Sequence, residues 1–321
     1  MELGQPIGME KGAATRDAFG ETLAWLGQEN DQIVVLDGDV SDSTRTRAFG
    51  EAFPERFFNL GIAESNLVSV ASGLAAAGKL PLAASFAAFL LGNAYDQIRM
   101  GIAYPRLNVK LVGSHSGISV GEDGASQMAI EDLALAATFP GFTVLVPADE
   151  VATRWATRAM LAHTGPVYLR TGRPPAPRVH PPERTFEIGQ AVQLRDGPDI
   201  TLIACGLMVA AALEAAAMLA QRGIGARVLD MHTVKPIDQA AILRAAQETG
   251  AIVTAEEHSI VGGLGAAVAQ IVALHHPVPM GFVAIMDHYA ESGEPQQLFQ
   301  KYGLMPEHIV QAAERALQQR A

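Results

Sequence analysis

Short apolar segments alternate with longer alanine-rich segments along the chain, and this alternation constrains the fold more than any other feature. The short segments are bounded by turn residues, so each is expected to be a strand buried on both faces. In the first half these strands are expected at residues 33–37, 79–85, 108–113, 142–147 and 166–170. Helices are expected at residues 64–77, 93–102, 128–138 and 149–162, with Ser65 and Asp149 as helix-start residues. Alternating strands and helices predict parallel βαβ units and a doubly wound sheet.

A proline-rich segment at residues 173–186 interrupts the pattern. Its sequence, RPPAPRVHPPERTF, contains five prolines in fourteen residues, so it is expected to be an extended linker. A second series follows, with strands expected at residues 199–205, 226–231, 251–256 and 279–286 and helices after Met208, Pro236 and Gly262. The sequence therefore predicts an α/β protein of two doubly wound domains with mainly parallel sheets, at residues 1–172 and 187–321.

The composition excludes several classes of protein. The formal charge is −11, from 23 Lys and Arg against 34 Asp and Glu, which argues against nucleic-acid and membrane-surface binding. The most apolar stretch, residues 74–91, contains Lys79 and Pro81 and is shorter than the ~20 residues of a bilayer helix. The single cysteine, Cys205, excludes an internal disulfide, and charges within residues 2–16 interrupt any signal peptide. We expect a cytoplasmic protein.

Several residues of the first half could carry chemistry. Glu64 opens an expected helix, where the helix dipole favours a carboxylate, but a buried Glu64 could also share a proton with a ring nitrogen. Phe86 and Phe89 are either core residues or a clamp for a heterocycle. Asp37 and Asp39 follow a strand at the edge where open α/β sheets bind ligands, although turn chemistry explains them equally well.

A long polar loop within residues 113–133 favours a binding role over a structural one. It carries His115, Asp123 and Gln127 in a spacing that matches no familiar set of metal ligands, and long ordered loops at strand ends commonly hold ligands. Arg173, in RTGR, could meet a phosphate group or be solvated. The glycines at 262, 263 and 265 lack the spacing of a dinucleotide motif and predict a close-packed turn.

Six phrases spread along the chain resemble the C-terminal two-thirds of transketolase, from about Lys11 to the end. They are VVLDGDVSDST, ERFFNLGIAESN, SFAAFLLGNAYDQIRM, SHSGISVGEDGASQMAIEDLA, VYLRTGRP and LDMHTVKPID. The resemblance implies a pyrimidine-binding domain at residues 1–172 and a transketolase C-terminal domain at residues 187–321. It also implies thiamine diphosphate as the cofactor.

By this resemblance, Glu64 is the catalytic carboxylate that hydrogen-bonds N1′ of the aminopyrimidine and promotes loss of the C2 proton. Phe86 and Phe89 match the aromatic residues beside the pyrimidine, and Ile62 and Asp39 match neighbours of the same ring. Gln127 also falls beside the cofactor, where many bacterial and fungal transketolases have histidine.

The resemblance further implies a site for sugar phosphates. Ser43, His115 and Arg173 match phosphate-binding positions, with His115 expected to be a donor whose charge depends on pH, and Asp123 matches a residue that binds a substrate hydroxyl. Three segments that deliver these groups to one dianion would form charge-assisted bonds.

The sequence differs from full-length transketolases in one large respect. Those enzymes begin with a domain that carries GDG and a downstream Asn, which hold the diphosphate and a divalent metal, and this chain shows no such motif and no metal ligands of its own. The resemblance therefore implies the C-terminal subunit of a split-gene transketolase. Its expected partner is an N-terminal subunit that carries the GDG…N motif and holds Mg²⁺ or Ca²⁺, in a two-plus-two heterotetramer containing a homodimer of this chain.

Three alternatives use the same features differently. The beta chain of a 2-oxoacid dehydrogenase shares the fold and the glutamate but needs no phosphate-binding set. A 1-deoxyxylulose-5-phosphate synthase-like enzyme is a nearer relative of transketolase, but the SQMA and RTGRP motifs of this chain disfavour it. A non-catalytic assembly subunit would have been free to lose Glu64 or the Phe pair, and both are present.

Overall fold

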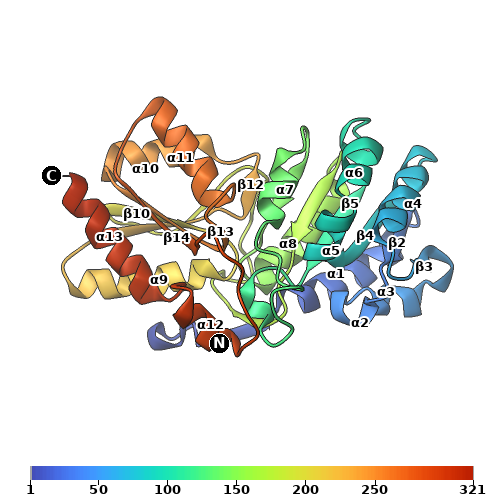
Figure 1. Ribbon diagram of the computed structural model, residues 1–321, viewed down its shortest axis with the longest axis horizontal. Helices are drawn as coiled ribbons and strands as arrows, with labels where there is room; N and C mark the ends of the chain where they lie inside the picture. Colours follow the sequence, from blue (N-terminus) through green and yellow to red (C-terminus); the bar gives the residue numbers. More distant parts are fainter. Residues whose placement is uncertain (1, 321) are drawn as a thin grey trace.

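The computed structural model describes residues 2–320, which form two open sheets covered by helices (Figure 1). The strand order in the first sheet is β12-β6-β7-β5-β4-β2-β3, and all neighbours are parallel except β12 and β6. Its strands are β2 (Ile33–Asp37), β3 (Phe57–Asn59), β4 (Leu80–Phe86), β5 (Lys110–Ser114), β6 (Thr143–Leu145), β7 (Val167–Arg170) and β12 (Thr233–Lys235). The predicted parallel βαβ organisation is confirmed.

Helices cover both faces of this sheet. On one face, α1 (Thr15–Glu29), α3 (Arg47–Ala52) and α8 (Glu150–Ala162) pack around Phe19, Phe49 and Met160. The other face carries α4 (Glu64–Ala76), α5 (Ala87–Asn93), α6 (Tyr95–Gln97), the π-helix η3 (Ile98–Ala103) and α7 (Asp132–Thr138). The first half also contains four short elements: η1 (Gln5–Ile7), α2 (Ser41–Thr44), η2 (Pro54–Arg56) and η4 (Ile118–Val120). Strands buried on both faces explain why their sequences are apolar throughout.

The second sheet has the order β14-β13-β10-β11-β9, with β9 antiparallel to β11 and the other neighbours parallel. Its strands are β9 (Val192–Arg195), β10 (Ile200–Ala204), β11 (Ala226–Asp230), β13 (Ile252–Ser259) and β14 (Met280–Ile285). Its helices are α9 (Met208–Gln221), α10 (Gln239–Thr249), α11 (Leu264–His275), α12 (Pro295–Lys301) and α13 (Pro306–Arg320). None of the helices in residues 2–320 is long and apolar enough to cross a membrane.

The helix boundaries partly agree with the sequence. Asp149 caps α8, because its Oδ1 accepts the Ala152 N–H at 2.8 Å. The assignment of Ser65 as a helix start is wrong, since α4 begins at Glu64. The helix predicted from residue 128 begins only at Asp132, because the preceding backbone pairs with the polar loop: Gly117 N–H donates to Ala129 O at 2.7 Å.

The helix predicted at residues 93–102 is present as two consecutive elements, α6 and the π-helix η3, from Tyr95 to Ala103. Helix α5 ends at Asn93, and the short α6 and the π-helix η3 follow it. Ile98 and Ile102 are fully buried, so their helical spacing located the segment but neither its π-helical geometry nor the separate helix α5 before it.

The proline-rich linker is an ordered strap. Its residues Pro175–Pro177 form β8, which pairs antiparallel with β1 (Lys11–Ala14). Further along, the N–H groups of Val179 and His180 donate to Asp149 Oδ2 at 2.9 and 2.8 Å, and the buried His180 ring bonds Asp230 at 2.8 Å. The linker therefore contacts both halves of the chain.

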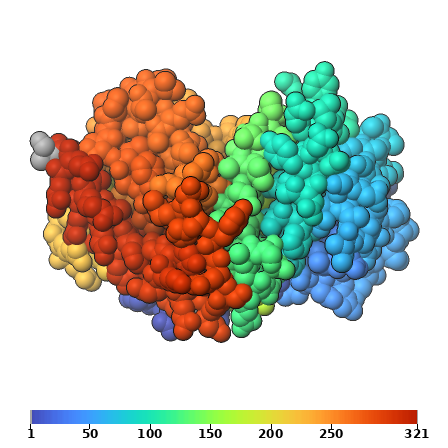
Figure 2. Space-filling model, in the orientation of Figure 1, coloured from blue at the N-terminus to red at the C-terminus, as the bar shows by residue number. Residues whose placement is uncertain are grey.

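Strand β12 carries the second half of the chain into the first sheet. It follows β11 directly and pairs antiparallel with β6, and its Lys235 Nζ donates to the carbonyls of Ala137 and Phe139 at 2.7 and 2.6 Å. One apolar cluster also runs across the boundary, from Leu133 and Val144 to Leu229. Figure 2 shows the two lobes in contact along the middle of the molecule.

Candidate active site

Glu64 is a buried carboxylate at the carboxyl edge of the first sheet. It is 4% exposed at the first position of α4, where the helix dipole favours its negative charge. Ser85 Oγ donates to Glu64 Oε1 at 3.0 Å, and Asn93 Nδ2 lies 3.5 Å from Oε2. These two partners leave acceptor capacity on the carboxylate, which can therefore hold a proton or bind a further donor.

Gly38 lets the backbone pass close to this carboxylate. It follows β2, and a Cβ atom there would lie 3.0 Å from Ser85 Oγ and 3.6 Å from Glu64 Oε1. Any larger residue would therefore crowd the Ser85–Glu64 hydrogen bond. This close approach explains why a glycine stands at the centre of the Asp37-Gly38-Asp39 turn.

Three rings are stacked at the end of β4, next to Ser85 in the sequence. Phe86 ends β4 and Phe89 lies in α5, and their rings are stacked with centroids 5.5 Å apart. The Phe86 ring is also stacked on the His115 imidazole at 4.0 Å. The end of β4 therefore contacts both groups: Ser85 bonds the Glu64 carboxylate, and the next residue, Phe86, stacks on His115 of the polar loop after β5.

Arg16 connects two of the predicted phosphate-binding residues. Its Nη1 lies 3.3 Å from the carbonyl of Ser43 and 3.3 Å from His115 Nε2. Because a guanidinium can only donate, Nε2 accepts and the imidazole proton lies on Nδ1, which is 2.9 Å from Ser114 Oγ. The Arg16 Nε atom is buried and lacks a hydrogen-bond partner within the described residues, so this guanidinium retains donor capacity.

His115 is neutral at physiological pH, contrary to the expectation that its charge changes with pH. Burial lowers the pKa of His115, the positive charges of Arg16, Arg173 and Arg45 lower it further, and it reaches about 3. His115 also has a φ of 58°, an uncommon left-handed conformation. The imidazole therefore acts as a fixed polar group among three guanidinium groups.

Arg173 reaches the same loop from the strand β7 side. Its Nη1 donates to the carbonyl of Val120 at 2.7 Å and lies 3.4 Å from Asp123 Oδ1. The predicted residues Arg173 and Asp123 are thus in contact. Both side chains are about one-third exposed, so a ligand can reach them from solvent.

Two arginines of this cluster were missed by the sequence analysis. Arg16 opens α1, a helix that was not predicted, and Arg45 has a left-handed φ of 67° just after α2. Arg45 Nε bonds Asp17 Oδ1 at 2.5 Å, which holds it beside Arg16. The available signal was weak: Arg16 and Asp17 follow the segment KGAAT and lie in the first turn of α1.

Three other predicted residues lie nearer the surface. Asp39 accepts a hydrogen bond of 2.7 Å from Asn59 Nδ2 and has a left-handed φ of 67°. Ile62 is 84% exposed just before α4, and Gln127 Oε1 accepts from its neighbour Ser126. Among the described residues, the structure joins none of these three to Glu64 or to the arginine cluster by a hydrogen bond. Their exposed positions are open to a ligand or a partner chain.

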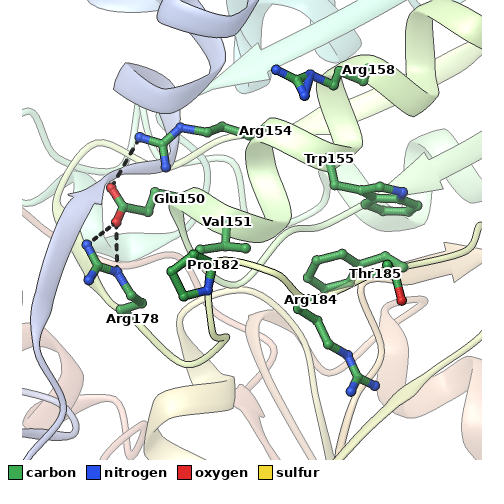
Figure 3. Close-up of a pocket in the computed structure, with 10 residues that line it drawn as sticks. Glu150, Val151, Arg154, Trp155, Arg158, Arg178, Pro182, Arg184 and Thr185 are labelled. Carbon is green, nitrogen blue, oxygen red and sulfur yellow. Dashed lines mark hydrogen bonds and ion pairs between the residues drawn. The ribbon is translucent and has the colours of Figure 1, made fainter.

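A different pocket, of about 490 Å³, lies between α8 and the linker (Figure 3). Its wall includes Trp155, Phe186 and four arginines, and none of the predicted site residues lines it. The Glu150 carboxylate neutralises two of these arginines, Arg154 and Arg178, which lie on either side of it. The candidate catalytic and binding residues described above therefore lie at the sheet edge, outside this pocket.

Two other observations bear on binding groups. Within residues 2–320, no group of three or more His, Cys, Asp or Glu side chains is arranged to hold a metal ion. The close-packed turn predicted at the glycines after residue 261 is confirmed, because a Cβ on Gly263 would lie 2.1 Å from Glu256 Oε2. The N–H groups of Leu264 and Gly265, both 2.7 Å from Glu256, bind that carboxylate at the start of α11.

Comparisons with known proteins agree with this geometry. Residues 11–178 match the family model for the transketolase pyrimidine-binding domain, and residues 189–309 match that for the transketolase C-terminal domain. The chain is 44% identical to the 6-deoxy-6-sulfo-D-fructose transketolase subunit of Clostridium sp. (strain MSTE9), over 93% of this chain and 92% of that one. It is 38% identical to a subunit of the apulose-4-phosphate transketolase of Phocaeicola vulgatus (strain ATCC 8482), over 94% and 96% of the two chains.

A solved structure shows the same fold over its full length. The chain of a split-gene transketolase, described as an inactive beta4 tetramer, superposes with a TM-score of 0.91 at 49% identity, over 97% of this chain and 100% of that one. Both domain models, the relatives and this structure point to the same family, as the sequence resemblance does. The chain therefore belongs to the transketolase family, with the pyrimidine-binding domain and the C-terminal domain in one polypeptide.

Proposed function

We propose that this chain is the C-terminal subunit of a thiamine-diphosphate-dependent transketolase that transfers a two-carbon ketol unit from a ketose phosphate to an aldose phosphate. The observation that carries this proposal is the continuous stack of Phe89, Phe86 and His115. It supports one site at the carboxyl edge of a parallel sheet, because Ser85, the residue before Phe86, bonds the buried Glu64 and because Arg16 bonds His115. Open α/β sheets bind ligands at that edge.

The residues present fit the aminopyrimidine ring of thiamine diphosphate. Glu64 offers a buried carboxylate with free acceptor capacity, and the stacked pair Phe86 and Phe89 offers an apolar ring surface. Bound thiamine diphosphate supplies an acidic carbon that, once deprotonated, accepts the ketol unit. In this proposal Glu64 holds a proton at N1′, Ser85 orients the carboxylate, and the Phe pair excludes water from the ring. Asp39, Ile62 and Gln127 contact the cofactor at its exposed side.

The arginine cluster fits the anionic end of a sugar substrate. Arg16 and Arg173 offer charged donors, Ser43 offers a hydroxyl, and the neutral His115 orients the Arg16 guanidinium. Asp123 would bind a substrate hydroxyl, and its contact with Arg173 holds it at the entrance. The names of two relatives each contain a sugar with an anionic group: 6-deoxy-6-sulfo-D-fructose in one and apulose 4-phosphate in the other.

A partner subunit completes the site in this proposal. The diphosphate and Mg²⁺ or Ca²⁺ would be held by an N-terminal subunit that carries the GDG…N motif, in a two-plus-two heterotetramer with a two-fold axis. Relatives of the same length are named as subunits, and the similar beta4 tetramer is described as inactive. The single buried Cys205 fits a reducing compartment, and we place the complex in the cytoplasm.

Reconstitution tests this function. The chain alone, with thiamine diphosphate and Mg²⁺, should transfer no ketol unit, and activity should appear when an N-terminal subunit carrying GDG…N is added. Light scattering of the active complex should give the mass of two copies of each chain. Ketol transfer by the chain alone, at a rate that the partner does not change, would overturn the proposal.

A further inference from the structure

Glu257 of the C-terminal domain is buried against residues 117–119 of the polar loop that follows β5 in the other domain. It lies near the end of β13 and is 5% exposed. Its Oε1 accepts the Ser119 backbone N–H at 2.5 Å. A Cβ atom on Gly117, whose φ is +78°, would lie 2.2 Å from Glu257 Cδ, so the carboxyl group packs directly on the backbone of that residue. The backbone at Gly117 and Ser119 is therefore held by contacts with one side chain of the second domain.

The residues held by Glu257 are next to the predicted phosphate ligands. Gly117 is two residues from His115, and Ser119 directly precedes Val120, whose carbonyl accepts from Arg173 at 2.7 Å. Displacement of the 117–119 backbone would therefore shift two things together: the His115 ring, which is stacked on Phe86, and the Val120 carbonyl, which accepts from Arg173.

The position of Glu257 is itself fixed by a buried ion pair. Arg170 donates to the Glu257 carbonyl at 2.9 Å and makes two hydrogen bonds, of 2.8 and 3.0 Å, to Asp132. Tyr168 OH donates to the same Asp132 carboxylate at 2.8 Å. Burial raises the pKa of Glu257 to about 7, and the Arg170 charge opposes this shift. A carboxyl group retained in such surroundings costs free energy, which is consistent with a role beyond packing.

We propose that Glu257 is a positioning residue that holds the 115–120 loop in its substrate-binding conformation, so that the C-terminal domain sets the affinity for the phosphate end of the sugar. This inference rests on the proposed transketolase function. It assigns the C-terminal domain a specific role at the site, exerted through one hydrogen bond and one backbone contact. Glu257 touches the loop and not the substrate.

Three variants test this role. Glu257→Met has a similar size but no acceptor for the Ser119 N–H, whereas Glu257→Gln keeps an amide oxygen there. Glu256→Gln is the matched control, because Glu256 is a buried carboxyl in the same strand that binds the start of α11 instead. In the reconstituted complex, Glu257→Met should raise KM for a ketose phosphate about tenfold, the effect of losing one hydrogen bond, and leave KM for hydroxypyruvate unchanged. Glu257→Gln should restore KM to within about threefold, and Glu256→Gln should leave it unchanged.

Amide hydrogen exchange of the isolated chain gives a readout that needs no activity. Glu257→Met should speed exchange at residues 115–120 about tenfold or more and leave the strand β10 amides as in the wild type, while Glu256→Gln should affect only the start of α11. Unchanged exchange in the loop with an unchanged KM ratio overturns the inference. Faster exchange throughout the chain, with equal losses for both donors, also overturns it, because Glu257 would then be only structural. A wild-type complex without ketol transfer would refute the proposed function, and the exchange result would still decide whether Glu257 holds the loop.

Discussion

The Ser85 hydroxyl donates a hydrogen bond of 3.0 Å to Oε1 of Glu64, and both side chains are buried. Ser85 lies near the end of β4 and Glu64 at the first position of α4, so the bond joins the sheet edge to the helix start. It fixes one carboxylate oxygen and leaves the other near Asn93, at 3.5 Å. This arrangement fixes a single buried carboxyl group at the edge of the sheet, next in sequence to Phe86 through its partner Ser85.

Glu64→Gln should separate the catalytic role of this carboxyl from its structural role. Glutamine can still accept from Ser85 but cannot hold a titratable proton, so ketol transfer should fall about 100-fold or more. If the fold is intact, the free energy of unfolding should change by less than ~1 kcal/mol, the size of a helix-dipole effect. NMR of the reconstituted complex would measure exchange of the thiamine C2 proton. Ser85→Ala keeps the carboxyl and should cost only about tenfold, and wild-type exchange in Glu64→Gln would exclude the catalytic role.

The arginine cluster predicts selectivity for phosphorylated donors. Arg16→Ala and Arg173→Ala each remove charge-assisted bonds worth ~1.5–3 kcal/mol, so KM for a ketose phosphate should rise about 10- to 100-fold. KM for hydroxypyruvate, which has no phosphate group, should stay the same. Arg47→Ala is the control, because Arg47 is exposed and paired with Asp42 and Glu51. Equal losses with both donors would show that the two arginines are structural.

His115 should stay neutral across the physiological range. Burial and the charges of Arg16, Arg173 and Arg45 lower its pKa to about 3, so the ring has no proton to gain or lose between pH 5 and pH 8. In NMR spectra of the histidine ring nitrogens in the substrate-free chain, the His115 signals should not shift over this range and should show a proton on Nδ1. His115→Gln identifies the signal by its loss. A titration midpoint near 6.5 would contradict the buried, arginine-flanked position.

Glu257 should make stability depend on pH in a defined direction. Burial raises its pKa from 4.5 to about 7, so from pH 4.5 to 7 the unfolded chain releases a proton that the folded chain retains. The contribution of this group is therefore fully present below pH 4.5 and is lost as the pH rises through 7, by roughly 3 kcal/mol. Glu257→Gln has no such proton, so its stability relative to wild type should increase from pH 4 to pH 8. Urea-unfolding midpoints of both proteins at the two pH values give the comparison, and a constant difference would refute the assignment.

The sequence predicted the parallel strands well because their residues are apolar on both faces. Residues 33–37 match β2 at both ends, and the other predicted strands agree to within a few residues. The missed strands are short and have little apolar pattern: β8 is Pro175–Pro177, which pairs only because β1 lies beside it. Helix α5 was also missed, since the predicted helix begins only at residue 93, where α5 ends.

The candidate site was predicted as a set of separate residues, and the structure supplies their connections. Glu64, Phe86, His115 and Arg173 each end or follow a parallel strand or start a helix after one, so topology brings them to one edge. Arg16 escaped notice because its partners, Ser43 and His115, are 27 and 99 residues away. The neutral state of His115 likewise depends on burial and on three arginines from different segments, so the residues around His115 in the sequence could not predict it.

The pairing of β12 with β6 means that the boundary between the two sequence domains is not a boundary of folding. Thr233–Lys235 belong to the second half of the chain but occupy the edge of the first sheet, beyond the linker at 173–186. A polypeptide ending at the linker would leave the β6 edge bare, with unpaired backbone groups that invite aggregation. A protease cut within the linker, by contrast, would leave two fragments still held together by a shared sheet. Evolution could divide such a protein before its first sheet far more easily than between its two domains.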